Sequence, residues 1–152
     1  MTATTMHVCP WAAGVPAGTP TTPIQITITS FGYNHGPAPT ADITVDARRL
    51  HIPTDRPGMS RRTGRSAKIR RTILVTPGAR ELVHHAAAGA LDLMVITGRR
   101  VTIAAGCATG RHASVVLARE IGRLIRADDI TVRVEHRDID KPALLSSREG
   151  GA

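Results

Sequence analysis

The amino-acid sequence predicts an α/β fold: one domain with a mostly parallel sheet of about four strands flanked by helices, in the order β-β-α-α-β-α-β. Three observations predict this fold class. Four short segments alternate apolar and polar residues at period two, as strands with one buried face do. Segments between them carry apolar stripes at helical spacing, and strands separated by helices pair in parallel. The 152 residues include only three aromatic side chains, so aliphatic residues have to fill the core.

The first two predicted strands follow a segment without periodicity. Residues 1–23 are rich in Thr, Ala, Gly and Pro and predict a disordered leader. Isoleucines alternate with polar residues over 24–29 and predict the first strand, and turn-forming residues follow over 30–37. The second strand is predicted over 43–45 and ends at Asp46. The connection of about ten residues is borderline for a parallel crossover, so the sequence leaves the direction of the second strand open.

Two helices are predicted in the middle of the chain. The first spans about residues 66–75. Thr76 has the chemistry of an N-cap and Pro77 suits the first position of the next helix. An apolar stripe at helical spacing then continues until Gly98, which is expected to end that helix.

The last part of the domain has the order strand, loop, helix, strand. The third strand is predicted over 101–105, and the glycine-containing loop 106–115 leads into a helix with one apolar face. The fourth strand is predicted over 130–135. The domain is therefore predicted to cover residues 24–141, with a flexible tail over 142–152.

The loop 106–115 is a candidate phosphate-binding loop. A tight turn before a helix leaves backbone N–H groups unpaired at the helix N-terminus, where the helix dipole also favours an anion. Further polar side chains follow the ends of the other strands, and ligands of open α/β sheets bind outside these carboxyl ends. If the second strand ran antiparallel, its polar residues would leave the site. The sequence predicts one crevice for a phosphorylated ligand, lined by His35, Asp46, Arg48, Thr109, Gly110, Arg111, His112, Ser114, His136 and Arg137.

Two alternatives compete with simple binding: catalysis by Cys107 and a metal site. Cys107 lies beside the predicted helix N-terminus and near Arg111, which could lower its pKa, so a phosphatase or phosphoryl-transfer enzyme is the alternative function. Thiol phosphatases carry an arginine six residues after the cysteine, and here that position is Ala113. A structural Cys107 is therefore the favoured interpretation. The histidines lack the close spacing of metal ligands, so we expect neither a metal nor a cofactor.

The net charge of +8 is concentrated in one segment. Residues 56–80 contain eight basic residues and no acidic one, whereas basic and acidic residues are equal in number elsewhere, with 12 of each. A concentrated positive charge suits polyanions such as RNA, although a solvated basic loop is an equally good interpretation. The candidate RNA-binding residues are Arg61, Arg62, Arg65, Lys68, Arg70 and Arg71.

Other signals place the chain among soluble cytoplasmic proteins. No apolar run approaches the roughly 20 residues of a membrane span. The N-terminus has no basic region followed by an apolar stretch, which a secretory signal requires. Cys9 and Cys107 lie in very different settings, so a disulfide framework is not expected.

Four motifs in the same order resemble the C-terminal domain of the RNase adapter protein RapZ. Residues 30–36 match S-F-G-[FY]-K-H-G with asparagine in place of lysine, and 46–53 resemble D-V-R-x-L-P. Residues 106–115 resemble G-C-T-G-G-x-H-R-S-V, and 136–138 are similar to the ending H-R-D/T. The likeness covers 26–141, which is the whole predicted domain.

The chain also departs from that family. Ala113 replaces the arginine of the glycine loop, which leaves the ligand, or the competence of the site, open. The P-loop motif G-x-x-x-x-G-K-[ST] is absent from the sequence, so we expect a stand-alone C-terminal module.

The resemblance implies a non-catalytic regulatory module. Characterised members bind glucosamine-6-phosphate and small RNAs, present RNA to an endoribonuclease, and form oligomers. By this resemblance the expected partners are a sugar phosphate, a small RNA with its ribonuclease, and further copies of the chain. The implied sugar-phosphate residues are His35, Asp46, Arg48, Thr109, Gly110, His112 and Ser114.

Overall fold

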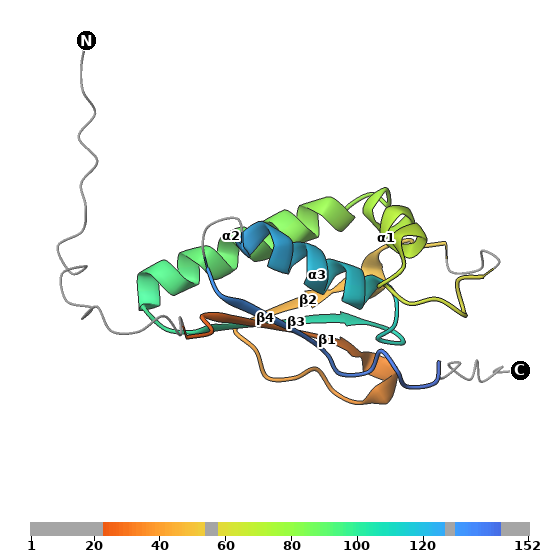
Figure 1. Ribbon diagram of the computed structural model, residues 1–152, viewed down its shortest axis with the longest axis horizontal. Coiled ribbons are helices and arrows are strands. Elements are labelled where there is room, and N and C mark those ends of the chain that lie inside the picture. Colours follow the sequence, from red (N-terminus) through yellow and green to blue (C-terminus); the bar gives the residue numbers. More distant parts are fainter. Residues whose placement is uncertain (1–22, 54–57, 127–129, 144–152) are drawn as a thin grey trace, which may run out of the picture.

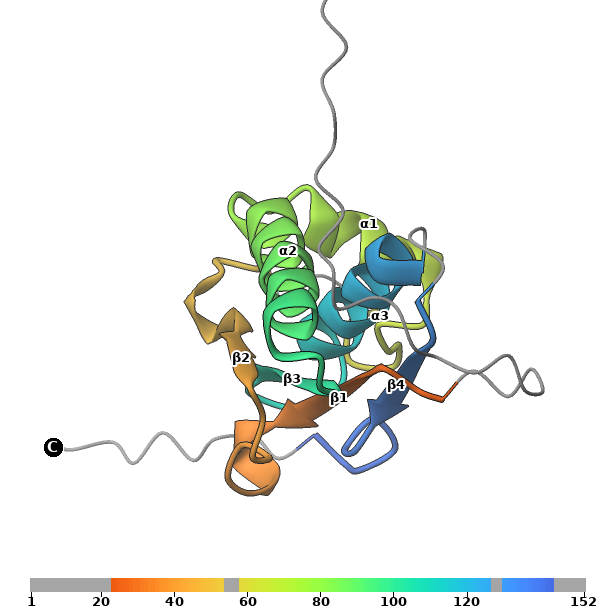
Figure 2. The ribbon, with the colours of Figure 1, turned by 90° about the vertical axis from the view of Figure 1, so that its left-hand side faces the viewer.

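The sheet has four parallel strands, as predicted. The computed structural model describes residues 23–53, 58–126 and 130–143; nearly all of the predicted leader and tail, and Cys9, lie outside these ranges. The strands lie in the spatial order β2-β3-β1-β4 (Figures 1 and 2). They are β1 (Ile26–Gly32), β2 (Ile43–Asp46), β3 (Val101–Cys107) and β4 (Val132–His136).

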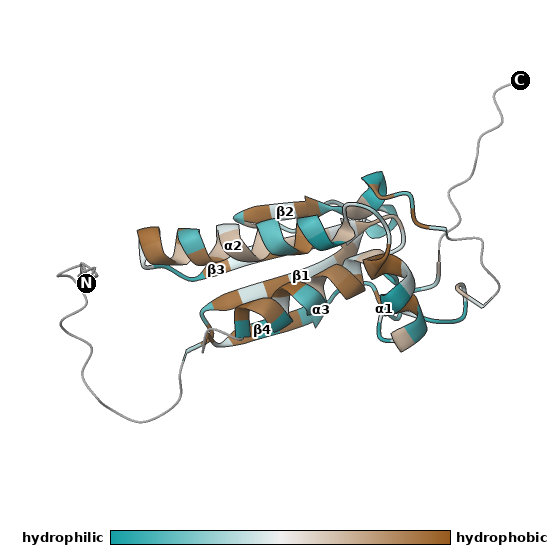
Figure 3. Cartoon of the chain, turned by 90° about the horizontal axis from the view of Figure 1, so that it is seen from above, coloured by the Kyte–Doolittle hydropathy of each residue, from teal (hydrophilic) through white to brown (hydrophobic). Residues whose placement is uncertain are grey.

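The three α-helices cover one face of this sheet, which makes a two-layer domain (Figure 1). Helix α3 lies over β1, β3 and β4, and α2 lies over β2 and β3. The core between the layers is aliphatic, as the scarcity of aromatic residues requires. Figure 3 shows hydrophobic and hydrophilic residues alternating along α2 and α3, as expected for helices that bury one side. The helices are α1 (Ala67–Leu74), α2 (Ala79–Thr97) and α3 (Ala113–Arg126).

The structure settles the direction of β2, which the sequence left open. Strand β2 pairs with β3 in parallel, with Ile43 opposite Ile103 and Asp46 opposite Gly106. The connection from β1 to β2 crosses the face of the sheet opposite the helices (Figure 2). It also runs across the sheet in the opposite direction to the two helical crossovers, from β2 to β3 and from β3 to β4. Because both the face and the direction are reversed, all three connections have the same hand. The connection from β1 to β2 has to return only from the level of Cys107 to that of Ile103, about 13 Å at 3.3 Å per residue. Ten residues are therefore enough.

Tertiary pairing extends two strands beyond their predicted ends. Strand β1 continues through Gly32 instead of stopping at Thr29, because residues 30–32 pair in register with β3. Strand β3 correspondingly continues to Cys107. These residues contain serine, glycine and cysteine, which carry a weak strand signal in the sequence.

The start of α2 also differs from the prediction, whereas its end is as predicted. The helix follows Gly78, which has φ 87°, so Thr76 is not its N-cap. The Thr76 hydroxyl instead donates to the carbonyl of Thr72 in α1 at 3.1 Å. Gly98 ends α2 in the left-handed conformation with φ 61°, the expected helix stop. Among the described helices, none combines the length and apolar character needed to cross a bilayer.

Candidate functional site

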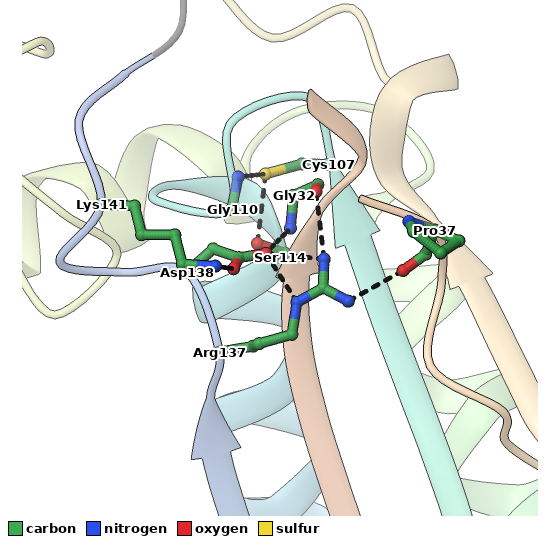
Figure 4. Close-up of polar contacts among 8 residues, drawn as sticks. All are labelled: Gly32, Pro37, Cys107, Gly110, Ser114, Arg137, Asp138 and Lys141. Carbon is green, nitrogen blue, oxygen red and sulfur yellow. Dashed lines mark hydrogen bonds and ion pairs between the residues drawn. The ribbon is translucent and has the colours of Figure 1, made fainter. Parts of the chain in front are cut away.

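Two glycines bring the loop after β3 against the end of β1. Gly110 has φ +73°, and a Cβ there would lie 2.7 Å from the backbone N of Gly32. A Cβ on Gly32 would lie 2.5 Å from the carbonyl carbon of Thr109. Both positions therefore require glycine, and the backbone contact fixes the loop at the carboxyl edge of the sheet (Figure 4).

A buried carboxylate ties this edge together. Asp138 is fully buried, and its Oδ2 accepts hydrogen bonds from the Gly32 N–H at 2.8 Å and from the Arg137 Nε at 2.9 Å. Its Oδ1 forms an ion pair with the Lys141 Nζ at 2.6 Å (Figure 4). Burial alone would raise the pKa of this carboxyl, but the bonds from Arg137, Lys141 and Gly32 lower it to about 2. Asp138 is not among the predicted site residues, although it ends the motif over 136–138.

Arg137, a predicted ligand-binding residue, braces the same edge. Its Nη1 donates to the Pro37 carbonyl at 2.8 Å and its Nη2 to the Gly32 carbonyl at 3.3 Å. Its guanidinium also lies 5.2 Å from the centre of the Phe31 ring, within the range of a cation–π contact. Together with the bond to Asp138, these contacts occupy much of its donor capacity within the protein.

Asp46 and Arg48 form a pair at the end of β2, on the same edge. The Asp46 Oδ2 accepts from the Arg48 Nη2 at 2.7 Å, and its Oδ1 accepts from the Arg48 Nε at 3.0 Å. The hydrogen bond from Arg48 holds the pKa of Asp46 below its usual value. The Arg48 guanidinium lies 3.5 Å above the Tyr33 ring, which connects the end of β2 to the turn after β1.

The thiol of Cys107 is buried inside the loop. The Gly110 N–H donates to its Sγ at 3.2 Å, and the Ser114 hydroxyl oxygen lies 3.1 Å from the same sulfur. Ser114 is itself fully buried. The first-turn N–H groups of α3 at residues 113–115 have no acceptor within the helix. The loop thus offers backbone donors, while the Ser114 hydroxyl points to the interior.

His112 joins the loop to the basic segment. Its Nε2 lies 2.8 Å from the carbonyls of both Met59 and Arg62; because carbonyls only accept, this nitrogen carries the proton. The Gly64 N–H donates to the Arg111 carbonyl at 2.7 Å. Residues 59–64 are therefore held next to the loop.

His136 lies on the helix-covered side of the sheet. Its Nδ1 is 2.7 Å from the Ser30 hydroxyl, and its ring lines a cleft that also contains Arg119. Burial lowers the pKa of His136, and the positive charges of Arg65 and Arg119 lower it further. Since the next residue, Arg137, contacts Phe31, which is on the opposite face, the structure separates two side chains that the sequence placed in one crevice.

Two predicted ligand-binding side chains have buried nitrogens without a partner. The Nε2 of His35 and the Nε of Arg111 are buried and make no hydrogen bond within the described part of the chain. Their loops adjoin, since the Asn34 N–H donates to the Ala108 carbonyl at 3.0 Å. Buried polar groups are normally hydrogen-bonded, so these two exceptions in adjoining loops make this part of the edge a candidate binding site.

The described residues contain no group of three or more His, Cys, Asp or Glu side chains close enough to hold a metal ion. The strand ends offer several hydrogen-bond donors: the first-turn amides of α3, the unpartnered Nε–H of Arg111 and further guanidinium groups. Such a set suits an anion or a polyhydroxylated ligand.

The fold and this edge define a single-domain, parallel α/β protein with a candidate anion site at the carboxyl ends of its strands. Residues 24–140 match the model of the RapZ C-terminal domain, and the chain belongs to this family. The family resemblance carried by the four sequence motifs is thereby confirmed.

Similar proteins are known in several bacteria. The chain is 35% identical over 126 residues to a nucleotide-binding protein of Frankia alni, with 78% of this chain and 42% of the relative covered. It is 37% identical over 123 residues to a nucleotide-binding protein of a Parafrankia species, with the same coverage. It is 38% identical over 120 residues to a nucleotide-binding protein of a Mycobacterium species (strain KMS), with 76% of this chain and 39% of the relative covered. The chain thus spans about two fifths of the length of these curated relatives.

Proposed function

We propose that this domain is a non-catalytic regulatory module that binds a phosphorylated small molecule at the carboxyl edge of its sheet, an amino-sugar phosphate such as glucosamine-6-phosphate. The observation that carries the proposal is the pair of buried, unpartnered nitrogens on His35 and Arg111, in adjoining loops beside the start of α3. A phosphate accepts hydrogen bonds at every oxygen and would supply an acceptor for the Arg111 Nε–H, and for His35 in the tautomer that carries its proton on Nε2. Membership in the RapZ C-terminal domain family, and relatives named nucleotide-binding proteins, also support a phosphorylated ligand.

Within this proposal the residues have different tasks. The loop amide at Thr109, the α3 amides and Arg111 would hold the phosphate, while the Gly110 N–H stays bonded to the Cys107 sulfur and keeps the loop in shape. His35 and the Asp46–Arg48 pair would contact sugar hydroxyls or an amine. The bonds that His112, Ser114, His136 and Arg137 make within the protein favour a positioning task for these four, because their polar groups are already engaged.

Titration calorimetry of the full chain with glucosamine-6-phosphate, glucosamine and inorganic phosphate tests the proposal. Arg48→Ala removes a guanidinium of the proposed site, and Arg49→Ala removes the exposed neighbouring charge as a matched control. We expect selective binding of the sugar phosphate, weakened about tenfold or more by Arg48→Ala, as for one lost charge-assisted hydrogen bond, and less than about twofold by Arg49→Ala. The proposal fails if none of the three compounds binds, or if the two variants behave alike.

RNA binding through the basic segment is a second candidate function, favoured by a specific observation. The side chains of Arg61, Arg62, Arg65, Lys68 and Arg71 are exposed on a segment that His112 holds against the domain. The sixth predicted residue, Arg70, differs because its guanidinium is paired with the Glu120 carboxylate. With so few aromatic side chains, contact would be to phosphates and not by base stacking.

The salt dependence of RNA binding tests this second function. If the five exposed cations contact phosphates of a single strand, log K should fall with log salt at a slope of about −3.5. Replacing Lys68 and Arg71 by alanine should reduce the slope by about 1.4, whereas Arg99→Ala/Arg100→Ala at the other end of the sheet should leave it unchanged. An affinity that does not change between low and moderate salt would exclude RNA binding of this kind. A ribonuclease partner, oligomer formation and a cytoplasmic location stay predictions.

The enzymatic alternative has little support from the surroundings of Cys107. The thiol is 7% exposed and is occupied by the Gly110 N–H and by Ser114. A nucleophilic thiolate needs access to substrate, which a buried sulfur lacks. We therefore propose a structural task for Cys107.

A further inference from the structure

The helix side of the domain contains a cleft that neither the strand-end site nor the basic segment accounts for. It has a volume of about 360 Å³ and lies between α1, α3 and β4, which are neighbours in Figure 2. Val116, Val134 and Gly64 contribute its apolar part. The volume is within the range of small-ligand sites, about 300–1,000 Å³.

Arginines dominate the polar lining of this cleft. Among the described residues, Arg70, Arg119, Arg123 and Arg126 line it together with the carboxylate of Glu120, which gives these five side chains a net charge of +3. Glu120 is shared, since it accepts from Arg70 at 3.0 Å and from Arg123 at 3.3 Å. These described side chains therefore leave an excess of positive charge at the cleft, with Arg119, Arg123 and Arg126 exposed to solvent.

Arg119 is the arginine of this group with the least compensation. Its Nη1 reaches only the Gly64 carbonyl, at 3.5 Å, and no carboxylate of the described residues forms an ion pair with it. Arg126 likewise contacts a backbone carbonyl, that of Val132, at 3.1 Å. Guanidinium groups in a recess bind phosphate through paired N–H donors, and a weakly engaged guanidinium loses little when it turns to a ligand.

His136 adds a titratable group to the cleft. Its Nδ1 is engaged with the Ser30 hydroxyl at 2.7 Å. The charges that act on its ring are Arg65 before α1 and Arg119 on α3, which disfavour its protonation, and Asp140 after β4, which favours it. An anion placed between these arginines would reverse the balance and favour the protonated ring.

We propose that the cleft between α1, α3 and β4 is a second anion-binding site, which takes a small ligand carrying a diphosphate group, either inorganic or part of a nucleotide. Two linked phosphates carry on the order of three negative charges at neutral pH, which matches the excess charge of the lining. The apolar floor suits a bound organic body more than a hydrated single phosphate. This site is separate from the strand-end site, because Arg48, His35 and Arg111 do not line the cleft.

Calorimetric titration of the full chain with pyrophosphate, ADP and inorganic phosphate tests this proposal. Arg119→Ala should weaken pyrophosphate binding about tenfold or more, and Arg119→Lys should recover part of the affinity through its charge. Arg133→Ala is the matched control, since Arg133 lies on β4 outside the cleft lining and pairs with Glu135. It should change the affinity less than about twofold, as expected for an exposed charge. Tighter binding of ADP than of pyrophosphate would identify a nucleotide as the source of the diphosphate. Equal or weaker binding of ADP would identify the inorganic ion as the ligand.

The pH dependence supplies an independent readout. Between pH 8 and 6, the wild type should take up more protons on binding pyrophosphate than His136→Gln does, because protonation of the ligand itself is common to both proteins. Absence of pyrophosphate and ADP binding, or equal binding by the wild type and Arg119→Ala, would overturn the proposal. If Arg48→Ala, and not Arg119→Ala, abolished pyrophosphate binding, the diphosphate would lie at the strand ends, and this result would also overturn the proposal. The proposal would also be overturned if single-stranded RNA bound in a manner that depends on Arg119 while pyrophosphate did not bind.

Discussion

Replacing Asp138 by asparagine tests whether the buried carboxylate holds the strand ends together. The pKa of Asp138 is lowered from an ordinary value of 3.8 to about 2 by Arg137, Lys141 and the Gly32 amide, in spite of its burial. At 1.36 kcal/mol for each tenfold change in proton affinity, this difference corresponds to about 2 kcal/mol of stability. Asparagine keeps the size and an acceptor for the Gly32 amide but loses the charge. We therefore expect Asp138→Asn to lower the free energy of unfolding by about 2 kcal/mol at pH 7.

The pH dependence has a definite sign. Because the pKa of Asp138 is lower in the folded state, the unfolded chain binds this proton more tightly. The stabilisation is complete above pH 3.8 and is lost as the pH falls through about 2. Urea unfolding followed by circular dichroism at several pH values between 7 and 2 measures it. The difference between wild type and Asp138→Asn should shrink as the pH falls below 4.

The exposed neighbour Asp140 provides the control. Asp140→Asn removes the same charge from the same loop without touching a buried bond, so it should change stability by less than about 0.5 kcal/mol. Equal stability of wild type and Asp138→Asn at pH 7 would refute the reasoning. A difference that is constant from pH 7 to pH 2 would also refute it, because charge would then not be its cause.

Three further predictions concern the loop and its surroundings. Gly110→Ala should destabilise the protein by about 3 kcal/mol or more, and the control Gly98→Ala by only about 1 kcal/mol. Both glycines have positive φ, but only Gly110 is packed against the backbone of another segment. Thermal unfolding measures the two losses of stability, and equal losses would contradict this prediction. Glu120→Gln should cost about 1 kcal/mol at pH 7, because its pairing with Arg70 lowers the Glu120 pKa below its ordinary value of 4.5. The cost should shrink as the pH falls below 4.5 and Glu120 is protonated, so a cost that stays constant with falling pH would speak against the ion pair. Neither wild type nor Cys107→Ser should hydrolyse p-nitrophenyl phosphate; wild-type turnover that the variant lacks would restore the enzymatic hypothesis.

Local patterns in the sequence were sufficient for much of the fold. The alternation of isoleucines and polar residues in β1 reflects burial of one strand face, and the stop of α2 at Gly98 reflects the freedom of glycine at positive φ. The predicted start of α2 was wrong, because a left-handed turn at Gly78 lies between Thr76 and the first helical residue, Ala79, and the sequence pattern did not indicate this turn. Pairing with β3 likewise decided that β1 continues to Gly32.

The candidate site was predictable as a location but not as a set of contacts. Parallel strands place their carboxyl ends at one edge, so residues after strands could be assigned to that edge from the sequence. Which face each side chain takes depends on the pleat and on its partners: His136 turns toward the helices and Arg137 away from them. The burial of Asp138 could not be predicted, because nothing in the sequence distinguishes a buried aspartate in a loop from an exposed one.

The fold class, the family and the positively charged segment could be read from the sequence, because periodicity, motif order and composition are properties of neighbouring residues. The direction of β2, the Gly32–Gly110 contact and the pairing of Glu120 with Arg70 became known from the folded structure. The folded structure also showed that Arg119, far along the chain from His136, lines the same cleft. These features arise from groups that come together only when the sheet and its helix layer have formed, and their energies depend on the burial which that packing creates.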